Sequence, residues 1–286
     1  SGEHPRMGAT DVCPLVPIAN IEMDEVVKYA HKLGERVGKE LGIPGYFYEY
    51  AASTEERRNL AVVRKGEYEA LKAKLVDPQW QPDFGPPEFV KAKHTGATAI
   101  SARDFLIAYN VNLNTTSTRR ANAVAYDIRE KGRIKRVGEV LSGDIVKDAD
   151  GNTLWTPGKL KHVKAIGWFI EEYGVTQVTM NITNITETPL HLAFDETAKA
   201  ANARGIRVTG SELVGLVPKS AMLEAGKYFL RKQNRSTGIH ESELIKIAIK
   251  SMGLDELGPF IPEERIIEYM LESGTDKKLV DLSLTD

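Results

Sequence analysis

The sequence has 286 residues, of which 42% are hydrophobic and 27% charged, the proportions of a globular protein with room for two modest cores. Its 38 Lys and Arg residues and 40 Asp and Glu residues leave a formal charge of -2, which argues against nucleic acid or an anionic membrane as a partner. The single cysteine, Cys13, excludes an internal disulfide and fits a cytoplasmic protein, and no apolar run reaches the roughly 18 residues of a membrane-spanning helix.

The residue pattern in the first part of the chain predicts a strand, a helix and a second strand. A segment with helical spacing of apolar residues and then a long loop follow. Apolar side chains recur every three or four positions in the helices and alternate with polar ones in the second strand. The loop contains four prolines, and loops of its length are usually functional or disordered. The predicted elements are an edge strand over 12–18, a helix over 24–41, a strand over 46–50, helical structure over 54–75 broken by Gly66, and the loop over 77–94.

The second part repeats strands, helix and strand, and ends in helices, so we predict two related α/β halves divided near Phe105. Ser117 has the position of a helix N-cap, and Asp150-Gly151 is typical of a hairpin turn. The predicted elements are strands over 97–101 and 105–113, a helix over 117–130, a hairpin over 145–155, strands over 163–170 and 175–182, a helix over 190–203, a strand over 206–209, and helices over 219–232, 242–252 and 263–271.

Few residue patterns in the chain point to a known chemistry. Neither standard glycine-rich phosphate loop is present, and Asp148 to Asn152 lacks the spacing of a calcium loop. His4 precedes a proline beside charged residues, which suits a general acid or base or simply a solvated loop position. His94 follows Lys91 and Lys93 at the end of the long loop, where the cluster either holds a carboxylate or is a solvated loop.

Four motifs in order resemble the formiminotransferase domain family, and the resemblance runs from residue 2 to about residue 272. They are Gly2–Pro14 (GEHPRMGATDVCP), Trp80–Pro86 (WQPDFGP), Phe105–Leu113 (FLIAYNVNL) and Gly210–Pro218 (GSELVGLVP). The family implies transfer of the formimino group of N-formimino-L-glutamate to N5 of tetrahydrofolate, with or without a polyglutamate tail, in histidine degradation. It also implies an α/β fold of two subdomains, each a mixed sheet with helices on its outer face, the two sheets facing each other across a folate-binding groove.

Carried over position by position, the resemblance implies that His4 is the catalytic histidine. Residues 142–157 resemble an insertion relative to shorter family members, and no function is inferred for them. The folate-binding segment is the end of the long loop, and it is longer here by a residue or two than in other family members. It comprises Gly85, Pro86, Pro87, Glu88, Phe89, Val90, Lys91, Ala92, Lys93, His94, Thr95 and Gly96.

The implied reaction needs a well-placed proton shuttle and requires neither a metal nor a covalent nucleophile. Because folate is anionic, we expect a local positive patch despite the negative total charge. Its predicted members are Lys91, Lys93, Lys159, Lys161 and Lys164.

The ends of the chain predict a piece of a bifunctional formiminotransferase-cyclodeaminase. The family's N-terminal segment is missing, and residues 278–285 resemble the opening of a cyclodeaminase domain. The predicted organisation is an incomplete N-terminal subdomain over 1–105, a C-terminal subdomain over 106–272, and a linker with the start of a third unit over 273–286. A homo-oligomer and a cyclodeaminase domain or subunit are expected partners. A folate-binding fragment without turnover, or an inactive assembly scaffold, stays open as an alternative.

Overall fold

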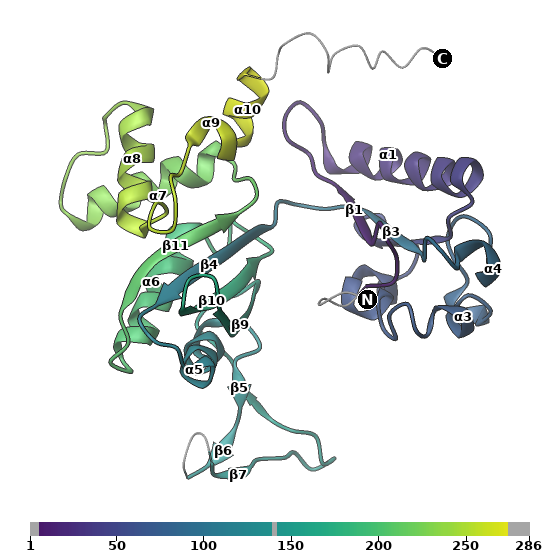
Figure 1. Cartoon of the computed structure of the whole chain (residues 1–286), viewed down its shortest axis with the longest axis horizontal. Helices are drawn as coiled ribbons and strands as arrows, with labels where there is room; N and C mark the ends of the chain where they lie inside the picture. The colour runs from purple at the N-terminus through teal and green to yellow at the C-terminus, as the bar shows by residue number, and fades with distance from the viewer. Residues whose placement is uncertain (1–5, 139–141, 274–286) are drawn as a thin grey trace. The chain divides into compact units, whose positions relative to one another are not determined.

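The structure of the protein, a computed structural model, describes residues 6–138 and 142–273 (Figure 1). The chain forms two compact units, Ser1–Asp104 and Phe105–Asp286. Both units combine strands with helices, which confirms the predicted α/β class. No helix in the described part of the chain is long and apolar enough to cross a lipid bilayer.

The first unit contains a parallel sheet with the strand order β1-β3-β2. Helix α1 connects β1 to β2, and a crossover of this kind is what parallel strands require. Ile100 of β3 pairs with Cys13 on one side and with Phe47 on the other. The elements are β1 (Val12–Leu15), α1 (Met23–Arg36), the π-helical turn η1 (Val37–Leu41), β2 (Gly45–Glu49), the 3-10 turn η2 (Glu55–Arg58), α2 (Leu60–Val63), α3 (Leu71–Lys74), the 3-10 turn η3 (Pro78–Trp80), α4 (Phe89–Ala92) and β3 (Thr98–Ala102).

Strand β3 lies at the centre of this unit and is buried along its whole length. One hydrophobic cluster contains Ala99 with Tyr46 and Leu71, and a second contains Ile100 with Phe47. Successive side chains of a strand point to opposite faces, so the two clusters lie on opposite sides of the sheet. This double burial explains why β3 lacks the alternation of polar and apolar residues seen in half-exposed strands.

Two predictions for the first unit were wrong in part. Residues 54–75, predicted to be helical, form the short turns η2, α2 and α3 rather than long helices. The reason is that Gly66 and Glu67 both adopt left-handed backbone conformations, with φ of 85° and 54°. The loop over 77–94 includes two short helical turns. The first begins where the Asp77 side chain accepts a hydrogen bond from the Gln79 amide, and the second is α4.

The second unit contains an antiparallel sheet with the strand order β11-β4-β10-β9. Helix α5 packs on β9 and β10, and α6 packs on β4 and β11, so both helices cover one face of the sheet. The elements are β4 (Ile107–Leu113), α5 (Thr118–Ile128), β5 (Arg133–Ile134), β6 (Arg136–Val137), β7 (Asp144–Ile145), β8 (Trp155–Thr156), β9 (Val163–Ile170), β10 (Val175–Ile182), α6 (Leu190–Asn202), β11 (Val208–Val214), α7 (Lys219–Lys232), α8 (Glu241–Met252), α9 (Pro262–Arg265) and α10 (Ile267–Ser273).

Strands β9 and β10 and helix α7 have the predicted bounds, and Ser117 caps α5 as predicted by accepting a hydrogen bond from the Arg120 amide. Strand β11 is longer than the predicted 206–209, because it continues along β4 as far as Val214. The helix predicted over 263–271 is interrupted at Ile266, which pairs with Val217 in an isolated parallel bridge.

The predicted hairpin over 145–155 is present, with an antiparallel bridge between Lys147 and Thr153. The Asp148 carboxylate accepts hydrogen bonds from the amides of Asp150 and Asn152, as expected for a turn rather than a calcium loop. The arms of the hairpin continue into β7 and β8, which pair with β6 and β5. The proposed insertion over 142–157 is therefore attached to the segment that follows α5.

Parallel and antiparallel pairing are divided between the units, since β1, β3 and β2 pair in parallel and β11, β4, β10 and β9 pair in antiparallel. That the two sheets face each other across a groove stays a prediction, as does the subdomain organisation over 1–105 and 106–272. The linker and third unit predicted over 273–286 lie, except for Ser273, outside the described residues.

Candidate active site

The predicted site residues lie in the first unit. His4 is outside the described residues, which begin at Arg6. The predicted folate-binding segment is described in full: residues 85–88 are irregular, α4 forms a single helical turn, and residues 93–96 lead into β3. The structure therefore locates the segment that follows His4 and the segment predicted to bind folate.

The segment after His4 forms a compact turn that is anchored at both ends. The Met7 amide donates a hydrogen bond of 2.8 Å to Oδ1 of Asp11, and the other carboxylate oxygen of Asp11 is paired with Arg64. The Met7 side chain is buried in the hydrophobic cluster below. The Tyr68 amide donates to the Arg6 carbonyl at 2.9 Å. These contacts fix the backbone from Arg6 to Asp11, a short distance along the chain from the predicted catalytic histidine.

The end of the predicted folate segment runs directly against this turn. The Ala9 amide donates to the Thr95 carbonyl at 2.8 Å, and the Ala97 amide donates to the Met7 carbonyl at 3.0 Å. A Cβ atom on Gly8 would lie 2.1 Å from the Ala97 oxygen, and one on Gly96 would lie 2.3 Å from the Met7 oxygen. Glycine is therefore required on both sides of the contact.

A cavity of about 400 Å³ lies where the two segments meet. Tyr68 closes one side of it, and its hydroxyl donates a hydrogen bond of 2.6 Å to the Lys93 carbonyl. Arg6 is held by two carboxylates, Glu67 at 3.8 Å and Glu69 at 3.3 Å. The lining residues are Arg6, Gly8, Ala9, Tyr68, Lys93, His94, Thr95 and Gly96. The structure thus brings together the last four residues of the predicted folate segment and the neighbours of His4.

The beginning of the long loop is held by a residue that the sequence did not single out. Arg57 is only 8% exposed, and its Nη1 atom lies 2.7 Å from Oδ1 of Asp83. Its Nη2 atom donates to the carbonyls of Gln79 and Gln81 at 3.0 and 2.9 Å. The second oxygen of Asp83 accepts from the Phe47 amide at 2.8 Å, so the loop is tied to strand β2.

Aromatic residues and a lysine complete this anchor. The Lys74 ammonium lies 4.2 Å from the centre of the Trp80 ring, and it donates a hydrogen bond to the Val63 carbonyl. Burial, together with the nearby positive charge of Arg57, lowers the pKa of Lys74 to about 8. The Tyr46 hydroxyl donates to the Trp80 carbonyl at 2.8 Å, and burial raises the pKa of that phenol.

The predicted positive patch is distributed over both units. Lys91 and Lys93 are exposed in the first unit, where Lys91 lies 3.9 Å from Glu88. Lys159, Lys161 and Lys164 are exposed in the second unit. Their joint action on one ligand stays a prediction. Among the described residues, no group of three or more His, Cys, Asp or Glu side chains is arranged to hold a metal ion.

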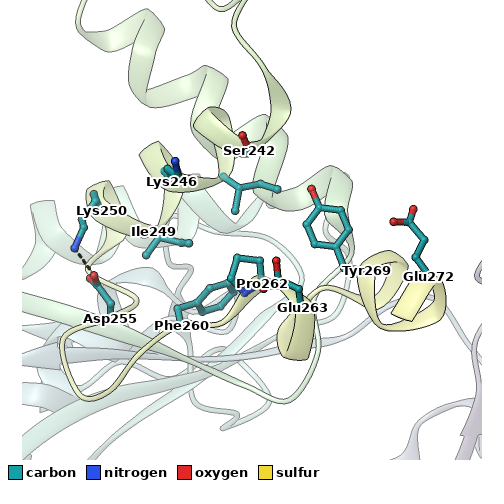
Figure 2. A pocket seen from close by; sticks show the side chains of 11 residues that line it. Ser242, Lys246, Ile249, Lys250, Asp255, Phe260, Pro262, Glu263, Tyr269 and Glu272 are labelled. Atoms are coloured by element: carbon teal, nitrogen blue, oxygen red, sulfur yellow. Dashed lines mark hydrogen bonds and ion pairs between the residues drawn. The ribbon is translucent and has the colours of Figure 1, made fainter. Parts of the chain in front are cut away.

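A larger cavity, of about 860 Å³, lies in the second unit and contains none of the predicted site residues (Figure 2). Its walls come from α8, α9, α10 and the loop before α9. Ile245, Ile249 and Phe260 form its apolar floor, and at one end Lys250 pairs with Asp255. The exposed surface of this cavity is mainly apolar.

Comparison with known proteins gives matches to both units. Residues 1–103 match the family described as the formiminotransferase domain, N-terminal subdomain, and residues 108–272 match the formiminotransferase domain. The formimidoyltransferase-cyclodeaminase of Gallus gallus is 47% identical over 277 residues, which cover 97% of this chain and 47% of that protein.

Two shorter relatives are covered more completely. The glutamate formimidoyltransferase of Thermoplasma acidophilum is 39% identical over 250 residues, or 86% of this chain and 73% of that protein. The protein of the same name from Streptococcus pyogenes serotype M1 is 38% identical over 233 residues, or 82% of this chain and 69% of that protein. The chain spans about half the length of the bifunctional relatives.

Proposed function

The chain belongs to the formiminotransferase domain family, and from this membership we propose that it transfers a formimino group from N-formimino-L-glutamate to N5 of tetrahydrofolate. The products are 5-formiminotetrahydrofolate and glutamate. The observation that carries the proposal is the meeting of two segments at one cavity: the turn that follows His4 and the end of the segment 85–96.

In the proposed reaction, N5 of tetrahydrofolate attacks the carbon of the formimino group and a tetrahedral intermediate forms. The bond from that carbon to the glutamate nitrogen then breaks. N5 loses a proton, and the departing glutamate nitrogen gains one, so a single group that accepts and then donates a proton balances the reaction. We assign this role to His4, because an imidazole titrates near neutral pH.

The described cavity suits the binding of a part of the folate. Its lining includes two cationic side chains, Arg6 and the exposed Lys93, and Arg6 is also paired with Glu67 and Glu69. Cationic side chains hold carboxylates in proteins, and folate carries carboxylates in its glutamate portion. We therefore propose that the segment 85–96 binds folate and that the predicted lysine patch extends this positive surface.

The related bifunctional enzymes support a cyclodeaminase domain or subunit as a partner. Homo-oligomeric assembly and a cytoplasmic location remain part of the proposal. The competing interpretation, a fragment that binds folate without turnover, concerns the same surface and differs only in the chemical step.

One pair of measurements separates these interpretations. A spectrophotometric assay follows formimino transfer, and a calorimetric titration of the same preparation with tetrahydrofolate follows binding. We expect both turnover and binding. Binding without turnover would support the non-catalytic interpretation, and absence of both would reject the proposed function.

A further inference from the structure

The large cavity of the second unit is an open groove between α8 and α10, with an apolar floor and a charged rim (Figure 2). Ile245 and Ile249 line it from α8, and Phe260 lines it from the loop before α9. Its lining residues belong neither to the turn after His4 nor to the segment 85–96. Exposed apolar surfaces of this kind mark places where another polypeptide segment binds.

The apolar surface continues beside the groove. Leu271 of α10 is the sequence neighbour of the lining residue Glu272, and Ile261 is the neighbour of the lining residue Pro262. These two side chains are 54% and 41% exposed. The second unit therefore presents apolar side chains next to the groove as well as within it.

The charges on the rim of the groove differ between its two ends. Lys246 and Lys250 stand on the α8 wall, and Figure 2 shows Lys250 at the end away from Tyr269 and Glu272 of α10. Burial, the hydrogen bond to Glu241 and the charge of Glu272 raise the pKa of the Tyr269 phenol to about 12. The α10 end of the groove is thus acidic, and the α8 wall carries cations.

The chain continues from the acidic end of this groove. Helix α10 ends at Ser273, directly after Glu272 and one helical turn after Tyr269, both of which line the groove. The residues that follow lie outside the described part of the chain. Their sequence is polar over 274–278 and mainly apolar over 279–284, where Leu, Val, Leu and Leu occupy four of the six positions.

The polar stretch is too short to carry the apolar residues far from the groove. The six peptide steps from Ser273 to Leu279 span at most about 22 Å when fully extended. Helix α8 has 12 residues and is therefore about 18 Å long. Six extended residues, 279–284, cover about 20 Å, which is close to the length of the α8 wall.

The order of charges along this segment matches their order along the groove. Lys277 and Lys278 precede the apolar residues, and Asp281 lies among them. A segment that turns back from α10 toward α8 brings its lysines near Glu272 first and its aspartate near Lys246 afterwards. Both placements bring opposite charges together.

We infer that residues 279–284 bind in the groove of their own chain and cover its apolar floor. Their leucine side chains replace water against Ile245 and Ile249, and the polar residues 274–278 form the turn that leads back from α10. Binding there fixes the segment that resembles the opening of a cyclodeaminase domain against the second unit. The inference does not depend on the proposed transfer reaction.

The test is methyl NMR of the whole chain, labelled at the methyl groups of isoleucine and leucine. We expect through-space contacts between the Ile249 methyl groups and those of Leu282 or Leu284, unchanged on dilution. The double variant Leu282→Ser with Leu284→Ser should remove these contacts and shift the signals of Ile245 and Ile249. The signals of Ile128, which is fully buried on α5, should stay where they are.

Charge reversal on the rim gives a second readout. Lys246→Glu should lower the ratio of bound to unbound segment about two- to fivefold, because an exposed attraction is replaced by a repulsion. Lys199→Glu, on α6, is the matched control and should leave the ratio unchanged. Each of these lysines lies 2.7 Å from a glutamate three residues earlier, and their side chains are 67% and 65% exposed.

The inference is overturned if the wild type shows no contact between the groove and residues 279–284, or if the double serine variant leaves the Ile245 and Ile249 signals unchanged. Contacts that form only between a labelled and an unlabelled copy would assign the groove to a second copy and also overturn it. Equal effects of Lys246→Glu and Lys199→Glu would reject the charge matching. Because no substrate is present, failure in the transfer assay would count against the proposed function alone.

Discussion

Arg57 and Asp83 form a buried ion pair, with Nη1 of the arginine 2.7 Å from Oδ1 of the aspartate. Both side chains also bond to backbone, Arg57 to the carbonyls of Gln79 and Gln81, and Asp83 to the Phe47 amide. The pair thereby ties the start of the long loop to a strand of the central sheet. The segment 85–96, proposed to bind folate, begins two residues after Asp83.

Breaking this pair should destabilise the first unit strongly. Arg57→Met leaves the Asp83 charge buried without its partner, and we expect the free energy of unfolding to fall by about 3–5 kcal/mol. Denaturant unfolding measures this loss. The double variant Arg57→Met with Asp83→Asn should lose less than the sum of the two single variants, and additive losses would show that the two side chains are not coupled.

Lys74 should make the stability of the first unit rise with pH in the alkaline range. Its pKa is about 8 in the folded chain against an ordinary value of 10.5, so between these values the unfolded chain binds more protons than the folded one. Stability therefore increases as pH rises through that window. Below about pH 8 the lysine is charged in both states, and its burial as a cation is a cost.

The comparison is made with Lys74→Met, in thermal unfolding at pH 7.5 and at pH 10. The wild type should gain melting temperature relative to the variant at the higher pH. Lys72→Met, which removes an exposed lysine from the same short helix, should show no such change. A difference between wild type and Lys74→Met that is the same at both pH values would contradict the assignment.

The contact between Gly8 and the strand entrance should tolerate no side chain. In Gly8→Ala the new methyl group would lie 2.1 Å from the Ala97 oxygen, so the turn after His4 must move away from residues 95–97. We expect a loss of about 1–3 kcal/mol in stability, as for other overpacked sites, together with weaker folate binding. Calorimetry measures the affinity, and thermal unfolding measures the stability.

Gly258→Ala provides the matched control, because a Cβ atom there meets nothing within 4 Å. It should change neither folate binding nor stability beyond a few tenths of a kcal/mol, roughly the size of an exposed substitution. If Gly8→Ala binds folate as well as this control does, the meeting of the two segments has no part in ligand binding.

Sequence patterns predicted those elements whose signal lies within one continuous segment. The alternation over 163–170 and 175–182 predicted β9 and β10 with the bounds that the structure has, and the helical spacing over 219–232 did the same for α7. The helical pattern over 54–75 predicted longer helices than the structure has. The left-handed turn at Gly66 and Glu67 and the burial of Arg57 against a distant loop divide it into short turns.

The site shows the same division between local and long-range information. The resemblance predicted a folate-binding role for residues 85–96, and the structure added that four of these residues line a cavity with Arg6 and Gly8. The hydrogen bond from Asn110 to Glu212 depends on the register of β4 with β11. That register places the two side chains next to each other although 102 residues separate them in the sequence. No spacing rule in a single segment reports such a pairing.

Charge reversal in the predicted lysine patch should weaken the interaction of the chain with polyglutamylated folate. We expect Lys91→Glu with Lys93→Glu to raise the apparent KM for polyglutamylated folate, because both lysines are exposed in the unit that carries the proposed folate segment. The second unit carries a separate group of predicted patch residues, Lys159, Lys161 and Lys164. Reversing their charges tests whether that unit contributes to folate binding.

The KM for monoglutamylated folate should change less than that for the polyglutamylated form, since the longer tail carries more negative charge. Lys72→Glu reverses an exposed charge elsewhere in the first unit and corrects for the change in total charge. If charge reversal in neither group of lysines changes the KM for polyglutamylated folate, the predicted patch is rejected. A rise in only one group would restrict the patch to that unit.

Replacement of His4 should separate catalysis from binding. The proposed reaction needs a group that takes a proton from N5 and returns one to the leaving amine, whereas the proposed folate contacts come from residues 85–96. His4→Ala should therefore abolish formimino transfer while leaving folate affinity largely unchanged. The transfer assay and a calorimetric titration are made with the same preparation of the variant.

His162→Asn is a suitable control for this experiment, because it removes an exposed imidazole at a position whose positive φ of 54° asparagine also accepts. It should keep normal turnover. Lost turnover with intact folate binding in His4→Ala would place the proton transfer at this residue, because a structural role would weaken both. Normal turnover in the variant would reject His4 as the acid and base and shift attention to His94, the imidazole that lines the described cavity.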